Sequence, residues 1–169
     1  MAVSLVVALL LSPAGFTEVD GSKHPFAAPQ PAVLIFALAE CPILRGYVPE
    51  LKRLGARRGV RFFLVQTDGH MKKAEALAFN REYSLHYIPV IDKNHALVKR
   101  FQVEAVPTAV VLDRQGHAAY VGRIDDRYPQ LGVQRLPRTR DLSDALDKVI
   151  KGLTIKRRTP VVGCAVPSL

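Results

Sequence analysis

The feature that most constrains the fold is the continuous apolar run Ala32–Ala37, which is followed closely by Cys41-Pro42 and a helix-like segment. An uninterrupted apolar run of this kind is typical of a central strand covered on both faces. Because proline is accepted in the first turn of a helix, Pro42 predicts a helix that begins directly after Cys41. The thiol would then lie at a helix N-terminus, where unpaired backbone N–H groups and the helix dipole favour a thiolate.

The remaining patterns alternate between strand and helix. The sequence predicts a hairpin over 16–24, strands over 60–65 and 88–91, helices over 70–83 and 95–101, a hairpin of strands over 109–112 and 118–121, and a closing helix over 141–150. The helix from Pro42 is expected to run to about Arg58, with Pro49 kinking its interior. This order predicts an α/β fold with a central mixed β-sheet flanked by helices, an N-terminal hairpin and a C-terminal tail.

A second proline, Pro107, extends the prediction from a fold class to a family. Val106-Pro107-Thr108 precedes an apolar strand, and Pro49 follows Cys41 at a fixed distance within the same helix. Together these features resemble the thioredoxin-like superfamily. In that superfamily the second proline is cis and lies against the active-site sulfur, so the resemblance assigns this role to Pro107. The segment 68–94 is similar to the extra segment of the redoxin branch, which includes AhpC/TSA-like proteins.

Several motifs narrow the resemblance to bacterial redoxin-domain proteins with a single Cys-Pro-Ile motif and a C-terminal Gly-Cys motif. They are Cys41-Pro42-Ile43, Tyr47-Val48-Pro49-Glu50-Leu51, His95-Ala96-Leu97-Val98, Pro107, the stretch 120–128, and Arg158-Thr159-Pro160-Val161-Val162-Gly163-Cys164. The resemblance covers about residues 16–166. It implies a thioredoxin-like fold and, as an expectation, thiol chemistry at Cys41.

The chain departs from the specialised branches of that superfamily at named positions. Leu44 stands where a Cys-x-x-Cys pair would have its second cysteine, which excludes dithiol exchange through a local pair. Leu34 and Leu38 stand where a peroxiredoxin has its proline and its Thr or Ser, so the hydroxyl that orients a peroxide is missing. Arg45 stands where copper-delivery relatives have a second cysteine.

Cys164 is therefore the remaining partner for Cys41. The tail is long enough to fold back across the domain, so we expect the two sulfurs to lie close together. We predict a thiol–disulfide oxidoreductase in which Cys41 is the nucleophile, Pro107 shapes substrate approach and Cys164 is the resolving cysteine. A static bridge between the cysteines is an open alternative, as are a binding module for copper or a protein partner and a weak thiol peroxidase.

The net charge of the chain and the spacing of its histidines and cysteines indicate which binding partners and cofactors to expect. The net charge of +9 is interpreted as a solvated basic face and a basic tail rather than a nucleic-acid interface, because few aromatic residues are interleaved with the basic ones. No histidine or cysteine spacing indicates a metal or other cofactor. The expected partners are thiol or disulfide proteins, or a small oxidant.

Two polar features of the sequence are interpreted as structural rather than catalytic. Arg123, Asp125, Asp126 and Arg127 are expected to form a salt-bridged loop rather than a catalytic cluster. His95 is expected to be a capping or surface histidine.

The N-terminus bears on localisation. The apolar run Val3–Leu11 is too short to span a bilayer but fits a signal-peptide core, with Ser12 and Ala14 spaced for cleavage. We therefore divide the chain into a signal peptide over 1–14, a redoxin domain over 15–151 and a basic tail over 152–169 that carries Cys164. This division predicts an extracytoplasmic protein with no membrane embedding after signal removal. A cytoplasmic protein is the alternative if Val3–Leu11 is a buried strand.

Overall fold

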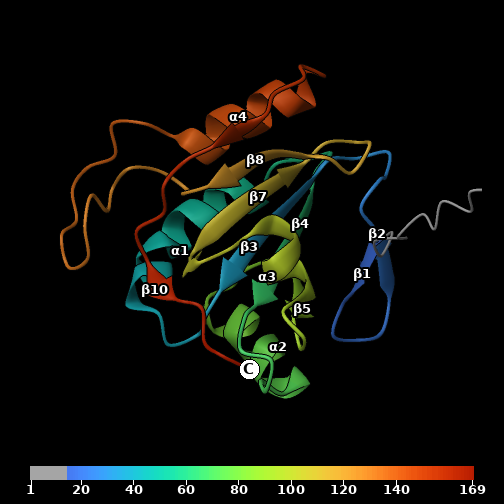
Figure 1. The fold of residues 1–169 in the computed structure, drawn as a ribbon, viewed down its shortest axis with the longest axis vertical. Coiled ribbons are helices and arrows are strands. Elements are labelled where there is room, and N and C mark those ends of the chain that lie inside the picture. Colours follow the sequence, from blue (N-terminus) through green and yellow to red (C-terminus); the bar gives the residue numbers. More distant parts are fainter. Residues whose placement is uncertain (1–14) are drawn as a thin grey trace, which may run out of the picture.

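The computed structural model describes residues 15–169, and its centre is a mixed six-stranded sheet with the strand order β5-β4-β3-β7-β8-β9 (Figure 1). The strands are β1 (Gly15–Thr17), β2 (Lys23–Pro25), β3 (Ala32–Ala37), β4 (Arg61–Gln66), β5 (Ile88–Ile91), β6 (Ala105–Val106), β7 (Thr108–Leu112), β8 (Ala118–Gly122), β9 (Arg157–Arg158) and β10 (Cys164–Ala165). The helices are α1 (Pro42–Gly55), α2 (Lys73–Glu82), α3 (Ala96–Phe101) and α4 (Asp141–Ile150). The predicted α/β fold with a central mixed sheet flanked by helices is confirmed. The predicted signal peptide lies outside the described residues.

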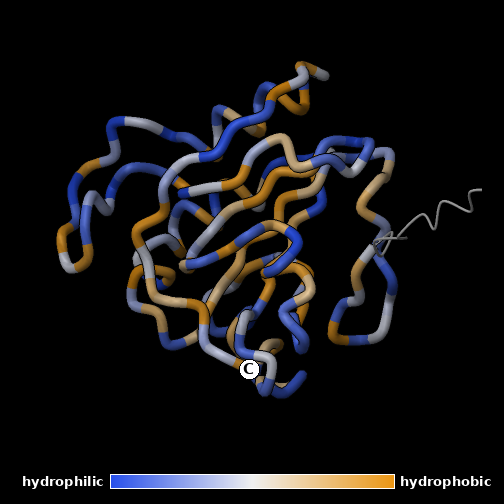
Figure 2. Tube along the Cα trace, viewed as in Figure 1, coloured by the Kyte–Doolittle hydropathy of each residue, from blue (hydrophilic) through white to orange (hydrophobic). Residues whose placement is uncertain are grey.

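The apolar run that forms β3 occupies the middle of this sheet. β3 pairs in parallel with β4 and antiparallel with β7, and every residue of β3 is buried. Figure 2 shows the central strands as a hydrophobic interior, with hydrophilic residues gathered mainly in the outer loops and turns. The prediction of a central strand covered on both faces is confirmed, because an exposed face would require polar residues at alternate positions.

Alternate residues of the central strands contact different layers of the protein. Phe36 and Phe63 contact Phe101 of α3 and Phe16 of the N-terminal hairpin, respectively. Phe62 contacts Tyr87, whose hydroxyl donates to the backbone carbonyl of Leu51 in α1 at 3.0 Å. Because neighbouring residues of a strand point to opposite faces, α1 covers one face of the sheet, and α3 with the hairpin covers the other.

The end of α1 and the start of α2 differ most from the predicted helix boundaries, and the end of α2 and the start of α3 differ by one residue. α1 ends at Gly55 rather than at Arg58, since glycine is a poor helix former and Gly59 adopts a φ of 76° close behind it. α2 begins at Lys73 rather than at His70. The side chain of Asp68 accepts from the backbone N–H of His70 at 2.9 Å and holds a turn there, and Glu75 accepts from the N–H of Lys72 at 2.8 Å.

The C-terminal segment is more ordered than a simple tail. β9 pairs in parallel with β8 at the edge of the main sheet, and β10 pairs antiparallel with β6 in a separate two-stranded sheet. In Figure 1 the segment runs from α4 along one edge of the sheet to β10 and then to the C-terminus. No helix within residues 15–169 combines the length and the apolar character needed to cross a bilayer.

Candidate functional site

Cys41 is positioned by the junction of β3 and α1. It is the N-cap residue of α1, with Pro42 at the first helical position, and the residue is only 1% exposed. No side chain caps this helix end, and its first turn contains no acidic residue. The backbone N–H groups at the start of α1 therefore leave a positive potential beside the sulfur, which would stabilise a thiolate in the reduced protein.

Cys41 forms a disulfide with Cys164, which lies 123 residues later in the chain. Their Cα atoms are 6.1 Å apart, a normal separation for a disulfide. The expected proximity of the two sulfurs is confirmed. Both cysteines of the chain are thereby accounted for.

The segment before Pro107 forms one wall of the site. The Val106–Pro107 peptide bond is cis, the conformation that the sequence analysis predicts, and the backbone carbonyl oxygen of Val106 lies 3.6 Å from the Sγ of Cys41. This sulfur carries no hydrogen in the disulfide, so the contact is a van der Waals approach. Pro107 itself is buried. The structure thus gathers the three predicted site residues, Cys41, Cys164 and Pro107, into one neighbourhood.

Cys164 reaches this neighbourhood through backbone pairing. Cys164 is opposite Val106, and Ala165 is opposite Ala105, in the β10–β6 ladder. Beyond the ladder, the N–H of Val166 donates to the carbonyl of Glu104 at 3.3 Å. The antiparallel pairing aligns Cys164 with the residue that precedes the cis-proline.

Upstream of Cys164, the tail is fastened to the main sheet at Thr159. The N–H of Thr159 donates to the carbonyl of Val121 at 3.0 Å, and its hydroxyl oxygen accepts from the N–H of Arg123 at 3.1 Å. The hydroxyl of Tyr120 donates to the carbonyl of Arg123 at 2.6 Å, which leaves the Tyr120 oxygen to accept from the Thr159 hydroxyl at 2.7 Å. Burial raises the pKa of Tyr120 to about 12. Every hydroxyl in this junction is therefore paired.

A glycine permits this close approach of the tail. A Cβ atom on Gly122 would lie 2.7 Å from the carbonyl oxygen and 2.9 Å from the nitrogen of Thr159. No pattern around Thr159 in the sequence predicted that this residue positions the tail. Gly122, directly after an edge-like strand, was the available signal.

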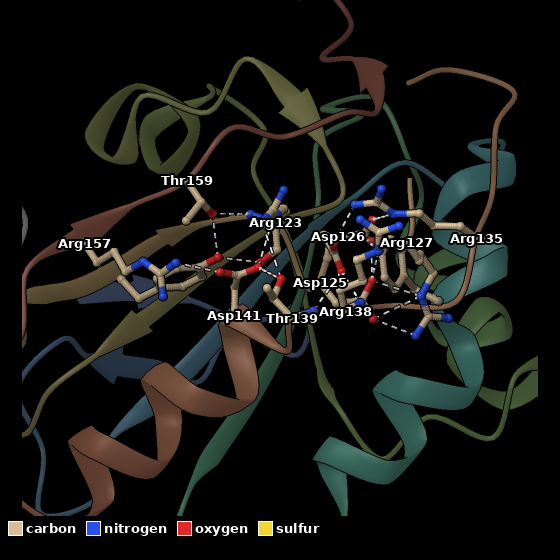
Figure 3. Close-up of polar contacts among 12 residues, drawn as sticks. Arg123, Asp125, Asp126, Arg127, Arg135, Arg138, Thr139, Asp141, Arg157 and Thr159 are labelled. Carbon is tan, nitrogen blue, oxygen red and sulfur yellow. Dashed lines mark hydrogen bonds and ion pairs between the residues drawn. The ribbon is translucent and has the colours of Figure 1, made fainter. Parts of the chain in front are cut away.

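The predicted salt-bridged loop is present next to α1 (Figure 3). Arg127 donates to the carboxylate of Asp125 from Nε at 3.0 Å and from Nη2 at 2.7 Å, and from Nη1 to the carbonyl of Gly46 in α1 at 3.2 Å. Tyr47 of α1 donates its hydroxyl to the same carboxylate at 3.0 Å, and burial is the main cause that raises its pKa. These contacts fix the loop against the first half of α1, the helix that begins at Cys41.

A neighbouring carboxylate closes the base of the long loop 126–140. Asp126 accepts from the backbone N–H groups of Thr139 at 2.9 Å and of Arg138 at 2.6 Å, and from Nη2 of Arg135 at 2.6 Å. These bonds, the one from Thr139 first, lower the pKa of Asp126 to about 2. A single side chain thus ties both ends of the loop together.

A third carboxylate connects α4 to the tail. Asp141 accepts from Nε of Arg123 at 2.9 Å and from Nη2 of Arg157 at 2.7 Å (Figure 3). Burial raises the pKa of Asp141, but the bonds from Thr139 and Arg123 outweigh burial and leave the pKa below its usual value. Part of the basic tail charge is therefore used in ion pairs within the protein.

Three of the positions that depart from the specialised branches are leucines that are buried or half-buried, and the fourth is the exposed Arg45. Leu34 and Leu44 are buried, and Leu38 is half-buried, so none of these positions offers a hydroxyl or a second thiol beside Cys41. Arg45 is exposed and donates from Nη2 to the carbonyl of Ala39 at 3.3 Å.

The expectation for His95 is wrong. His95 is buried, and its Nε2 lies 2.8 Å from the carbonyl oxygen of Thr67, with no capping bond from its side chain. The carboxylate of Asp92 caps α3 instead, accepting from the N–H groups of Leu97 at 3.1 Å and Val98 at 2.8 Å. The side chain of Asp92, which is shorter than that of His95 and lies about one turn earlier, therefore performs the capping that we predicted for the histidine.

Neither a cluster of metal ligands nor the cavity beside the N-terminal hairpin adds a group to the cysteine site in the described part of the chain. Within residues 15–169, no group of three or more His, Cys, Asp or Glu side chains is arranged to hold a metal ion. A large cavity of about 1740 Å³ opens between the β1–β2 hairpin, α3 and the β7–β8 turn, and none of Cys41, Pro107 and Cys164 lines it. The chemistry available at the candidate site is that of the two sulfurs and the backbone around them.

Comparisons with known proteins give structural likenesses only. No family model matches the chain, and no curated protein matches it. An uncharacterised conserved protein of Geobacillus kaustophilus is 21% identical, with a TM-score of 0.74 over 92% of this chain and 88% of that one. A thioredoxin-like protein of Aeropyrum pernix is 19% identical, with a TM-score of 0.56 over 82% and 88%. A secreted disulfide oxidoreductase of Mycobacterium tuberculosis, described as homologous to E. coli DsbE, is 20% identical, with a TM-score of 0.57 over 79% and 93%.

Proposed function

Because this chain has a thioredoxin-like fold, we propose that it is a thiol–disulfide oxidoreductase in which Cys41 is the nucleophile and Cys164 the resolving cysteine. The observation that carries the proposal is the disulfide between the helix N-cap Cys41 and a cysteine on a separately paired strand. A sulfur at this helix end gains thiolate character, which is what disulfide exchange requires.

The proposed reaction reduces a disulfide of a client protein. In the reduced enzyme, the Cys41 thiolate attacks one client sulfur, forming a mixed disulfide, and the other client sulfur leaves as a thiolate that takes up a proton. The Cys164 thiolate then attacks the Sγ of Cys41, and the second client thiolate leaves. The net change converts one client disulfide and two enzyme thiols into two client thiols and the Cys41–Cys164 disulfide. An external dithiol returns the enzyme to its reduced form.

The roles of the surrounding groups follow from their positions. The carbonyl of Val106, 3.6 Å from the Cys41 sulfur, limits the directions from which another sulfur can approach. The buried Pro107 has no N–H and leaves this edge without a donor at its own position. We propose an extracytoplasmic setting for this reaction, since protein disulfides persist in oxidising compartments.

A static-bridge binding module is the second candidate, and the burial of Cys41 favours it. At 1% exposure the residue is shielded from solvent in the disulfide form, as structural bridges commonly are. The two functions differ in whether the folded protein exchanges its disulfide. A static bridge should resist dithiothreitol until the protein unfolds, whereas the proposed oxidoreductase should be reduced while it stays folded.

Trapping tests the assignment of roles. The reduced Cys164→Ser variant should accumulate a mixed disulfide at Cys41 when it is mixed with a peptide disulfide, and mass spectrometry of the intact protein should detect it. The matched Cys41→Ser variant should not accumulate such an adduct at Cys164 at a comparable rate. Alkylation of Cys41 by iodoacetamide should give an apparent pKa below about 8.5. A pKa at or above that value, or equal trapping by the two variants, would overturn the assignment.

A further inference from the structure

Besides the disulfide, the strand that carries Cys164 is held to the domain by a short backbone ladder and by the packing of Cys164 and Val166 against the core. β10 forms a two-residue ladder with β6, and these two strands make up their own sheet. Between Thr159 and Gly163 the chain borders a cavity of about 750 Å³, whose lining includes Pro160 and Val161 of the tail and Glu104 of the domain. Once the disulfide is reduced, residues 160–166 would be held by this short ladder, by the bond from the N–H of Val166 to the carbonyl of Glu104 and by the packing of Cys164 and Val166 against the core.

Removal of this strand would expose the backbone beside Cys41. Within residues 15–169 β6 pairs with no other strand, so the edge at which Val106 faces Cys164 would be free to bind an extended chain, while the carbonyl of Ala105 stays bonded to the hydroxyl of Thr108 at 2.6 Å. The carbonyl of Glu104, which accepts from the N–H of Val166 at 3.3 Å, would be free as well. The tail and an incoming extended polypeptide would therefore compete for one edge.

The residue before Cys164 must be small at this edge. A Cβ atom on Gly163 would lie 2.7 Å from the carbonyl carbon and 3.3 Å from the nitrogen of Val106, and it would also overlap the Val106 carbonyl oxygen. These are backbone atoms, which cannot move aside as a flexible side chain does. The register that places a cysteine against Cys41 therefore selects glycine at the preceding position.

We propose that residues 160–166 are a built-in competitor for an extended client segment, and that this position selects a glycine directly before the client cysteine. The inference rests on the proposed function for the exchange step. In the mixed disulfide the client cysteine is bonded to Cys41, and its segment lies along β6. When Cys164 attacks the Cys41 sulfur, the client cysteine leaves as a thiolate and the tail takes over its strand position. The same movement of the tail therefore breaks the mixed disulfide between Cys41 and the client and displaces the client segment from β6.

Two peptides test the selectivity on the full-length Cys164→Ser variant. One peptide copies residues 158–167, and the other has alanine in place of the glycine before the cysteine. The single cysteine of each peptide is activated as a disulfide with thionitrobenzoate, which is the leaving group when Cys41 attacks. The glycine peptide should label Cys41 about tenfold faster than the alanine peptide, because the extra Cβ overpacks a backbone contact. Equal labelling rates at Cys41 would overturn the inference while leaving the proposed function intact. Failure of both peptides to label Cys41 would instead overturn the proposed function.

A second full-length variant tests the competition. Adding Gly163→Ala to Cys164→Ser should keep the protein's own tail off β6, so the glycine peptide should label Cys41 several-fold faster than in Cys164→Ser alone. Adding Ser168→Ala instead, at an exposed position beyond the strand, should leave the rate unchanged. A rate that Gly163→Ala does not raise would show that the tail does not compete for this edge.

Discussion

The hydroxyl of Thr159 donates to the hydroxyl oxygen of Tyr120 at 2.7 Å, which joins the C-terminal tail to the last antiparallel strand of the main sheet. Both side chains are buried. This bond lies between the basic edge strand β9 and the strand that carries Cys164. Beyond this bond the tail is attached through the β10–β6 ladder, the Cys41–Cys164 disulfide and the packing of Cys164 and Val166 against the core.

Replacing Thr159 by valine should therefore weaken the attachment of the tail. The N–H of Arg123 would lose its acceptor, and the free energy of unfolding should fall by about 1–2 kcal/mol. Urea denaturation measures this change. Thr154→Val, at an exposed position on the approach to β9, is the control and should change stability little. Equal effects of the two substitutions would contradict the role assigned to Thr159.

The disulfide should stabilise the oxidised protein strongly. It closes a loop between residues that are 123 apart, and in the chain-entropy account a crosslink of that span contributes about 5 kcal/mol. The reduced protein and the Cys164→Ser variant should fold but unfold at lower denaturant concentration than the oxidised protein. Adding a reductant should not change the midpoint of the variant, because it has no disulfide to lose. A reduced wild-type protein as stable as the oxidised one would contradict this prediction.

Arg127→Ala should be among the most destabilising surface-loop substitutions. Asp125 is buried with a side-chain exposure of 2%, and removal of its guanidinium partner leaves a buried charge without its ion pair. We expect a loss of about 3–5 kcal/mol in the free energy of unfolding. Arg138→Ala is the control, because Arg138 is exposed and contacts Asp126 through its backbone N–H rather than its side chain. Thermal unfolding of both variants measures the difference.

Asp126 should make stability depend on pH in acid. Hydrogen bonds lower its pKa in the folded protein to about 2, from a usual value of 3.8. The contribution of Asp126 is therefore fully present above about pH 4 and is lost as the pH falls through 2. Asp126→Asn should lower stability near neutral pH, and the difference from wild type should shrink towards pH 2. Denaturation curves at several pH values measure it, and a pH-independent difference would contradict the prediction.

Much of the framework follows from local patterns. Ala32–Ala37 predicts a doubly covered strand, and Pro42 predicts the helix start that places Cys41 at an N-cap. These features depend on hydrophobic periodicity and on the restricted backbone of proline, which neighbouring residues alone can express. The ion-pair loop around Asp125 and Arg127 is also visible locally, because the two partners are only two residues apart.

Other features depend on segments that meet only in the folded protein. Arg157 and Arg158 are exposed, basic residues with no strand pattern, yet they form β9 because the edge of β8 offers unpaired backbone groups. His95 is buried because Thr67, far away in the sequence, supplies a carbonyl partner for its ring. Neither outcome is encoded by the residues adjacent in the chain.

The sequence by itself determined that Cys41 lies at the start of a helix beside a central strand, and that Cys164 is its one potential disulfide partner within the chain. The tertiary structure alone decided that Cys164 arrives as an antiparallel strand opposite Val106, with Gly163 against the same backbone. The physical reason is the range of the forces involved. Helix starts and strand patterns follow from local backbone preference, whereas strand register is set by hydrogen bonds and steric contacts between distant segments.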